Sequence, residues 1–394
     1  MALTPIARLT PVILATATLV AGCTVANSNE PVCEPAPGLV AVVSVHQNVQ
    51  APSVHSTLGC TLEATIAAGE PIVVVGVDGT PDTLLARTFE VTDANPDARR
   101  DDIAAATAAV VNLINTAEAD SDGANLLMGI GMGADQARAL GASNAHMIII
   151  DSGVSDMGLN MTQPGMLAAQ PAEVADFLAA SGSTLDLQGF SGELVGFGYV
   201  SAPQDQLPIA AQKNTVAIWT GVLESFGMTV TVTPLARTGA GPDTAYTTQT
   251  VDVPAPSMMP IDEPWEEAEP PDVVYDSTSA LGFHDDSNEL LDRIAAAAEL
   301  APVAQWLAAD TGRSVHIVGT TASYGTKEGQ VTRSLGRAET IKSLLVAAGA
   351  DPTQISTEGA GYTANPPDRT ATGAHDPAAA ALNRTVHLIA RPNP

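Results

Sequence analysis

A proline-rich acidic stretch limits how this chain of 394 residues can fold. Residues 254–271 read Pro-Ala-Pro-Ser-Met-Met-Pro-Ile-Asp-Glu-Pro-Trp-Glu-Glu-Ala-Glu-Pro-Pro. The prolines cannot donate backbone hydrogen bonds to a helix or a sheet, and the carboxylates repel one another. We therefore expect a semi-stiff linker between two separately organised regions, residues 38–253 and residues 272–394.

The first region alternates short aliphatic or β-branched runs with longer runs of helical periodicity. This order is typical of a doubly wound, mostly parallel α/β sheet. The predicted strands are residues 39–45, 71–77, 146–150, 194–200 and 228–232, and the clearest helices are residues 99–117, 172–180 and a helix opened by Leu207-Pro208.

The N-terminal segment has the pattern of an export signal. Its apolar run to Ala21 is too short for a membrane span and contains Pro11. The run ends Leu19-Val20-Ala21-Gly22-Cys23, which resembles the lipobox of bacterial lipoproteins. The resemblance implies a signal peptide at 1–22 and acylation of Cys23. We expect a lipidated tether at 23–37 and an exported protein, anchored to the cell membrane or outer membrane and facing the cell wall.

Two further cysteines, Cys33 and Cys60, remain. An even number of thiols in an oxidising compartment favours a disulfide, which would fix the tether to the first region. Metal binding is the weaker alternative, because no histidine pair lies nearby with ligand spacing.

The charge balance restricts the partners. The chain has 44 acidic and 16 basic side chains, a formal net charge of -28. Such a surface repels phosphate backbones, so the sequence argues against nucleic-acid binding. Hydrophobic residues make up 45% of the chain, which is enough to build sizeable cores.

The second region predicts a smaller α+β fold. We expect strands at residues 273–275, 314–319, 355–359 and 385–389, with a helix N-capped by Ser287 and another at residues 329–348. The buried stripe expected on the latter helix is Val331, Leu335, Ala338, Ile341, Leu344 and Leu345.

Three motifs in this region carry a family resemblance. They are Val318-Gly319-Thr320-Thr321-Ala322-Ser323-Tyr324-Gly325, Gln330-Val331-Thr332-Arg333-Ser334-Leu335-Gly336-Arg337-Ala338 and Asn383-Arg384-Thr385-Val386. Together they resemble the OmpA-like peptidoglycan-associated domain, whose patterns are G-H-T-D-x-x-G, N-x-x-L-S-x-x-R-A and N-R-R-V. The matching positions are Gly319, Thr321, Gly325, Ser334, Arg337, Ala338, Asn383, Arg384 and Val386.

The resemblance implies a site for the peptide stem of peptidoglycan. In that family an arginine pairs with the carboxylate of the diaminopimelate end, and an aspartate pairs with its ammonium. Arg337 occupies the arginine position. The resemblance places the binding residues at Arg337, Thr321, Ala322, Ser334, Asn383 and Arg384.

The chain departs from the family at the aspartate position, where it has Ala322. Thr320, Gln330 and Thr385 replace the family's histidine, asparagine and second arginine. Three explanations remain open: a displaced acid such as Glu328 meets the ammonium, the ligand differs, or the domain is retained as a scaffold. If the family clamp is used, an aspartate restored at position 322 should raise affinity.

The first region has a fainter resemblance. His146 to Ile150, followed by Asp151-Ser152-Gly153, resembles the fourth strand and loop of a von Willebrand factor A-like domain. The metal-binding D-x-S-x-S of that family is replaced by Ser44-Val45-His46-Gln47-Asn48, so we expect no metal and no cofactor. Asp151, Ser152 and Asp156 follow the strand, where open α/β sheets bind ligands, and mark a candidate pocket or contact surface.

No nucleophile elbow or dinucleotide fingerprint fits its required spacing, and we expect no enzymatic activity. Two classes of function remain. The first is a lipid-anchored interaction protein that holds peptidoglycan through residues 272–394 and presents residues 38–253 to a protein partner. The second is an envelope enzyme or solute-binding protein that uses the Asp151 edge, with the C-terminal region only as a locator. A deep cavity at Asp151 would favour the second.

Overall fold

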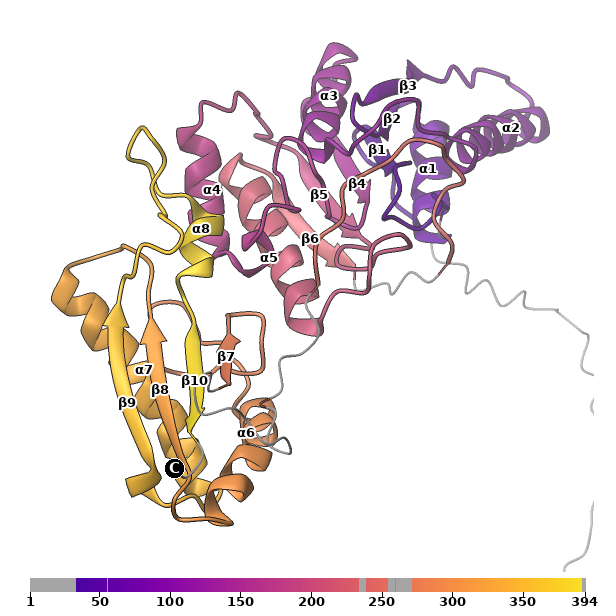
Figure 1. The fold of residues 1–394 in the computed structure, drawn as a ribbon. Coiled ribbons are helices and arrows are strands. Elements are labelled where there is room, and N and C mark those ends of the chain that lie inside the picture. Colours follow the sequence, from indigo (N-terminus) through magenta and orange to yellow (C-terminus); the bar gives the residue numbers. More distant parts are fainter. Residues whose placement is uncertain (1–32, 55, 234–238, 254–258, 260–270, 392–394) are drawn as a thin grey trace, which may run out of the picture. The chain divides into compact units, whose positions relative to one another are not determined.

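The computed structural model describes residues 33–54, 56–233, 239–253, 259 and 271–391 (Figure 1). The export signal, Cys23 and most of the linker lie outside these described residues. Residues 33–394 group as one compact unit. It contains two β-sheets with different topologies.

The first sheet has six strands in the order β3-β2-β1-β4-β5-β6. All neighbouring strands are parallel except β3, which runs antiparallel to β2. This arrangement confirms the predicted mostly parallel α/β sheet. The strands are β1 (Leu39–Ser44), β2 (Pro71–Val77), β3 (Asp82–Thr88), β4 (His146–Ile150), β5 (Ser191–Val195) and β6 (Thr229–Thr233).

Helices cover both faces of this sheet (Figure 1). Alternate β1 side chains face opposite ways: Leu39 packs with α1 and α2, whereas Val40 packs with the α3 side. Burial on both faces explains why the strand sequences are continuously apolar. The helices are α1 (Ser56–Ala68), α2 (Pro96–Asn115), α3 (Leu126–Ala139), α4 (Pro171–Ala180) and α5 (Ile209–Ser225), with a short 3-10 turn η1 (Met166–Ala168).

Three details differ from the sequence expectations. The edge strand β3 was not anticipated, because its side chains are mostly half-buried or exposed. Strand β5 ends at Val195 instead of residue 200, since Gly196 and Gly198 take positive φ angles of 84° and 83°. Helix α3, which is not among the clearest helices expected above, spans Leu126–Ala139 and contains the run Gly129-Ile130-Gly131-Met132-Gly133. A Cβ at Gly133 would lie 2.8 Å from Val40 Cγ1, so the glycine admits the helix close to the sheet.

The second sheet has four strands in the order β7-β10-β8-β9. Strands β8 and β9 are parallel, and β10 is antiparallel to both β7 and β8. Helices α6 and α7 form the apolar core with this sheet. The elements are β7 (Asp272–Tyr275), α6 (Arg293–Ala308), β8 (Ser314–Thr320), α7 (Lys327–Ala347), η2 (Pro352–Gln354), β9 (Ile355–Gly361), α8 (Pro377–Leu382) and β10 (Val386–Arg391).

Two expectations in this region are wrong. Helix α6 begins at Arg293, and its N-cap is Asp292, which accepts bonds from the Ile294 and Ala295 amides. On α7, Val331 is 45% exposed and Leu335 is 39% exposed. The reason is a close approach of backbones: a Cβ at Gly359 on β9 would lie 2.4 Å from the Val331 carbonyl oxygen. The glycines of the strand therefore bring it close to the helix backbone there, and they carry no side chains that could cover Val331 and Leu335.

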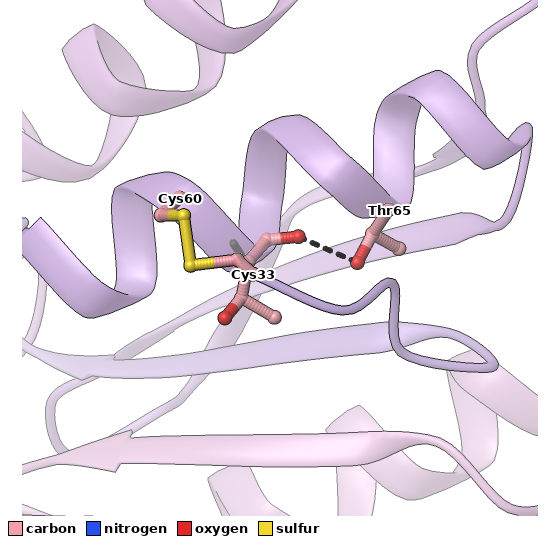
Figure 2. The surroundings of a disulfide bond; sticks show 4 residues. Cys33, Cys60 and Thr65 are labelled. Atoms are coloured by element: carbon pink, nitrogen blue, oxygen red, sulfur yellow. Dashed lines mark hydrogen bonds between the residues drawn. A yellow bond between two sulfur atoms is a disulfide. The ribbon is translucent and has the colours of Figure 1, made fainter. Parts of the chain in front are cut away.

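The predicted disulfide between Cys33 and Cys60 is confirmed (Figure 2). It joins the first described residue to helix α1, and the two Cα atoms lie 5.7 Å apart. Nearby, the Ala36 amide donates to Thr65 Oγ1 on the same helix at 3.1 Å. The bridge thus fixes the chain at the point where the predicted tether would enter the first sheet region.

Among the helices of the described residues, none combines the length and apolar character needed to cross a membrane.

Candidate functional site

The candidate site lies around the carboxyl end of β8, where the first motif meets α7. A Cβ at Gly319 would lie 2.1 Å from the Ser334 carbonyl oxygen, so only glycine allows this approach. Ser334 has no exposed surface, and its Oγ accepts the Gly361 amide at 3.0 Å. These two motif residues therefore hold β8, β9 and α7 together. Ser334, predicted as a binding residue, performs a packing role.

Asn383 makes hydrogen bonds that hold the loop after β9 in place. Its side-chain amide donates to the Pro366 carbonyl at 2.7 Å and to the Ala379 carbonyl at 2.9 Å, and its Oδ1 accepts the Asn365 amide at 3.3 Å. The residue is buried. Through these hydrogen bonds Asn383 positions the loop after β9, and its role in ligand binding stays a prediction.

Two of the departures from the family pattern lie side by side. Thr320 Oγ1 lies 2.8 Å from Thr385 Oγ1 and donates to the Asn383 carbonyl at 2.7 Å. The Thr320 amide donates to the Thr385 carbonyl at 2.9 Å. The threonine pair thus forms a small satisfied network where the family pattern has a histidine and an arginine.

Arg337 is a buried cation on α7, only 6% exposed. Its Nε donates to the Ser287 carbonyl at 3.1 Å, and its guanidinium lies 5.2 Å from the centre of the Phe283 ring. Burial, followed by the charges of Arg384 and Arg333, lowers the pKa of Arg337 to about 10. Among the described residues, no carboxylate lies within 4.0 Å of this guanidinium.

Arg384 approaches the site from the segment before β10. One guanidinium nitrogen, Nη2, donates to Glu173 Oε1, and the other, Nη1, is buried without a hydrogen-bond partner. The guanidinium lies 5.4 Å from the centre of the Tyr324 ring. Burial raises the pKa of Glu173, although the Arg384 charge opposes that shift. One arm of Arg384 is therefore available to an anion.

An acid from the loop between β9 and α8, Asp368, contacts the turn that contains Ala322. Its Oδ2 accepts the amide of Ser323, the residue after Ala322, at 2.7 Å. Glu328, the displaced acid considered from the sequence, is exposed in the first turn of α7. Asp368 stands alone in the proline-containing segment Pro-Pro-Asp-Arg, so no sequence pattern singled it out.

Asp368 is one of five residues beyond residue 271 that each have a buried polar side-chain atom without a hydrogen-bond partner. We term these five residues the polar cluster. Ten buried side-chain atoms of the described residues have no hydrogen-bond partner, and five of them belong to the polar cluster. Because buried polar atoms are normally paired, this concentration makes the polar cluster a candidate site for a polar ligand. The atoms are Thr321 Oγ1, Ser323 Oγ, Asp368 Oδ1, His375 Nδ1 and Arg384 Nη1.

Two rings accompany the polar cluster. Tyr324 stacks on His375 with the ring centres 3.7 Å apart and the planes 10° apart. Burial, together with the charges of Glu173 and Asp368, raises the pKa of Tyr324 to about 12. Burial and the nearby Arg369 lower the pKa of His375, while Asp368 opposes this shift. Both rings are therefore neutral near pH 7.

A cavity of about 920 Å³ lies beside the cluster. Arg337 and Arg384 both line it, together with Asp285, His284 and Thr385. Predicted site residues Thr321 and Ala322 are both buried at the end of β8, with exposed fractions of 6% and 3%. Of these four predicted residues, Arg337 and Arg384 line the cavity, whereas Thr321 and Ala322 are not among its lining residues.

The predicted residues of the first sheet have a different setting. Asp151 and Ser152 are buried. Asp151 accepts hydrogen bonds from Ser44 Oγ and the Gly153 amide, and its Oδ2 lies 3.3 Å from His46 Nε2. Asp156 accepts the amides of Ala124 and Gln249 at 2.6 and 2.9 Å. Neither Asp151 nor Ser152 presents surface to a ligand in this conformation. The resemblance of this segment to a von Willebrand factor A-like domain stays a prediction.

In the described part of the chain, no group of three or more His, Cys, Asp or Glu side chains is arranged to hold a metal ion.

Comparison with known proteins identifies the C-terminal region. Residues 282–380 match the OmpA family, so the chain carries an OmpA domain there. The match ends before the Asn383-Arg384 motif. It confirms the resemblance deduced from the motifs of residues 318–338. The comparison with curated proteins found no significant match.

Solved structures with similarity to the chain also cover only part of it. The peptidoglycan-associated lipoprotein of Burkholderia pseudomallei is 28% identical over 28% of this chain and 86% of its own, with a TM-score of 0.24. A periplasmic domain of Helicobacter pylori MotB is 15% identical over 31% and 83%, with a TM-score of 0.25. An outer membrane protein of Borrelia burgdorferi B31 is 20% identical over 31% and 88%, with a TM-score of 0.23.

Proposed function

We propose that this protein is an exported cell-envelope protein that binds peptidoglycan noncovalently through residues 272–394. The OmpA match at residues 282–380 supports this function. The observation that carries it is Arg337, a buried guanidinium that lines a cavity without a carboxylate partner among the described residues. A desolvated cation in that position favours an anionic ligand group, and guanidinium binds a carboxylate through two parallel hydrogen bonds.

The test is retention of the full chain by purified sacculi at low salt. Arg337→Gln should weaken retention at least about 30-fold, because loss of one partner of a buried charge pair typically costs about 2 kcal/mol or more. Arg333→Gln is the matched control. Arg333 lies four residues earlier on α7 and pairs with the exposed Asp286 at 2.8 Å, so its loss should change retention little. Equal effects of both substitutions, or no retention of the parent chain, would contradict the proposal.

We further propose that Cys23 carries the acyl anchor and that no catalytic step is involved. The lipobox pattern at residues 19–23 supports the anchor. Incorporation of labelled palmitate in the parent chain, and its loss in Cys23→Ser, is the expected result. A Cys23→Ser chain that remains labelled and membrane-bound would refute this part.

For residues 38–253 we propose an interaction surface for a protein partner. Support comes from the burial of Asp151 and Ser152, whose side chains are therefore not open to a substrate or solute. Cross-linking of the full chain in intact cells should capture a partner through this region. No observation favours the enzyme or solute-binding alternative.

A further inference from the structure

The carboxylate of Asp368 has an unusual environment for a buried charge. It has no exposed surface, Oδ2 accepts one backbone amide, and Oδ1 has no hydrogen-bond partner. No cationic side chain of the described residues lies within 4.0 Å of it. A buried carboxylate with half its hydrogen-bonding capacity unused destabilises the fold, and an external cation would offset that cost.

The backbone fixes this carboxylate at a specific place. The Asp368 amide donates to Tyr362 Oη at 3.1 Å, and its carbonyl accepts the Asp376 amide at 2.9 Å. Its side chain thereby meets the backbone directly after Ala322, the position at which the family has its acid. A loop distant in sequence thus delivers a carboxylate to the turn where the local sequence lacks one.

The acceptor atoms of the polar cluster suit an ammonium group. An ammonium carries three donors, and Asp368 Oδ1, Thr321 Oγ1 and Ser323 Oγ are three unpaired acceptors in this cluster. Arg384, with its unpaired Nη1, supplies the opposite charge in the same cluster. The cluster therefore offers both signs of charge, as a zwitterionic amino-acid end requires.

We infer that Asp368 is the anionic partner of a ligand ammonium, and that it replaces the acid absent at Ala322. This inference rests on the proposed peptidoglycan binding and specifies the ligand as a stem peptide with a free zwitterionic side-chain end. Since Asp368 has no exposed surface, binding of the ammonium at Oδ1 requires the side chains around it to rearrange.

The test compares two probes by calorimetry with the full chain. One is a stem peptide whose diaminopimelate has a free side-chain ammonium, and the other is the same peptide acetylated on that nitrogen. The parent chain should prefer the free form at least about 30-fold, the usual effect of removing one partner of a buried charge pair. In Asp368→Asn the preference should fall below about threefold. Glu358→Gln, at an exposed acid of the same sheet, should keep it.

Two additional variants protect the test against a folding defect. Asp368→Ser removes the charge and leaves a shorter polar side chain, and it should also abolish the preference. Ala322→Asp should restore it in the Asp368→Asn background. In the parent background Ala322→Asp should bring no gain, because two carboxylates would then repel each other beside Ser323.

The outcomes separate this inference from the proposed function. A parent chain that binds neither probe and no sacculi overturns both. A parent chain that is retained by sacculi but shows no preference between the probes overturns the role of Asp368 only. The same holds if folded Asp368→Asn and Asp368→Ser keep the parental preference.

Discussion

Two buried carboxylates, Asp151 in the first sheet region and Asp368 in the second, lie beside the carboxyl ends of strands but have opposite surroundings. Asp151 is paired on both oxygens, by Ser44 and His46 on one and by the Gly153 amide on the other. Asp368 is paired on one oxygen only. Burial alone therefore does not distinguish the two acids, whereas the unused hydrogen-bonding capacity of Asp368 does.

The strongest way to break this comparison is to neutralise each acid in turn. Asp151→Asn should destabilise the protein by about 2–3 kcal/mol, because an amide cannot accept from all three donors and leaves a buried group unpaired. Asp368→Asn should cost less than about 1 kcal/mol, or even stabilise, because its Oδ1 can still accept the Ser323 amide while the buried charge is lost. Urea unfolding followed by circular dichroism measures both. Similar losses for the two variants would invalidate the distinction.

A second experiment sharpens the comparison inside the C-terminal site. Thr320 and Thr321 are adjacent and equally buried, but only Thr320 Oγ1 is hydrogen bonded. Thr320→Val should cost about 1–3 kcal/mol of unfolding free energy, because it leaves partners of the threonine network unpaired. Thr321→Val should be close to neutral in stability yet weaken ligand binding. Thermal melting, with and without stem peptide, gives both values, and a stable Thr320→Val would be the contrary result.

The smallest effect concerns two histidines, one in each region. Burial lowers the pKa of both His146 and His375. The Nδ1 atom of His146 lies 2.9 Å from Ser191 Oγ, whereas Nδ1 of His375 has no hydrogen-bond partner. A histidine with a lowered pKa when folded stays neutral while its unfolded form takes up a proton. Stability is therefore intact above the unfolded pKa near 6.5 and declines as the pH falls below it.

Melting temperatures between pH 7 and pH 5 measure this decline. His146→Gln and His375→Gln should each make it slightly shallower, with an effect well below that of Asp151→Asn. For His375 the pH dependence should also change when stem peptide is present, since the ligand occupies the cluster that surrounds it. An identical pH profile for parent and variants would show that neither ring contributes.

Sequence patterns predicted the regular elements better than the site. Apolar runs such as residues 71–77 and 146–150 coincide with β2 and β4, because strands buried on both faces need apolar residues throughout. The prediction that Ser287 caps this helix was wrong, because the helix begins at Arg293 and Asp292 accepts the hydrogen bonds of its first amides. The prediction that Val331 and Leu335 are buried was wrong. Their exposure depends on a glycine of β9, and helical periodicity carries no information about that strand.

The sequence by itself determined the α/β and α+β order of the two regions, the Cys33–Cys60 bridge, and the OmpA motifs that contain Arg337. These features follow from local periodicity, residue type and spacing. Only the tertiary structure decided which polar residues face inward without partners. Asp368 lies 45 residues from Ser323 along the chain, and their contact arises from the fold that brings the loop after β9 to the end of β8.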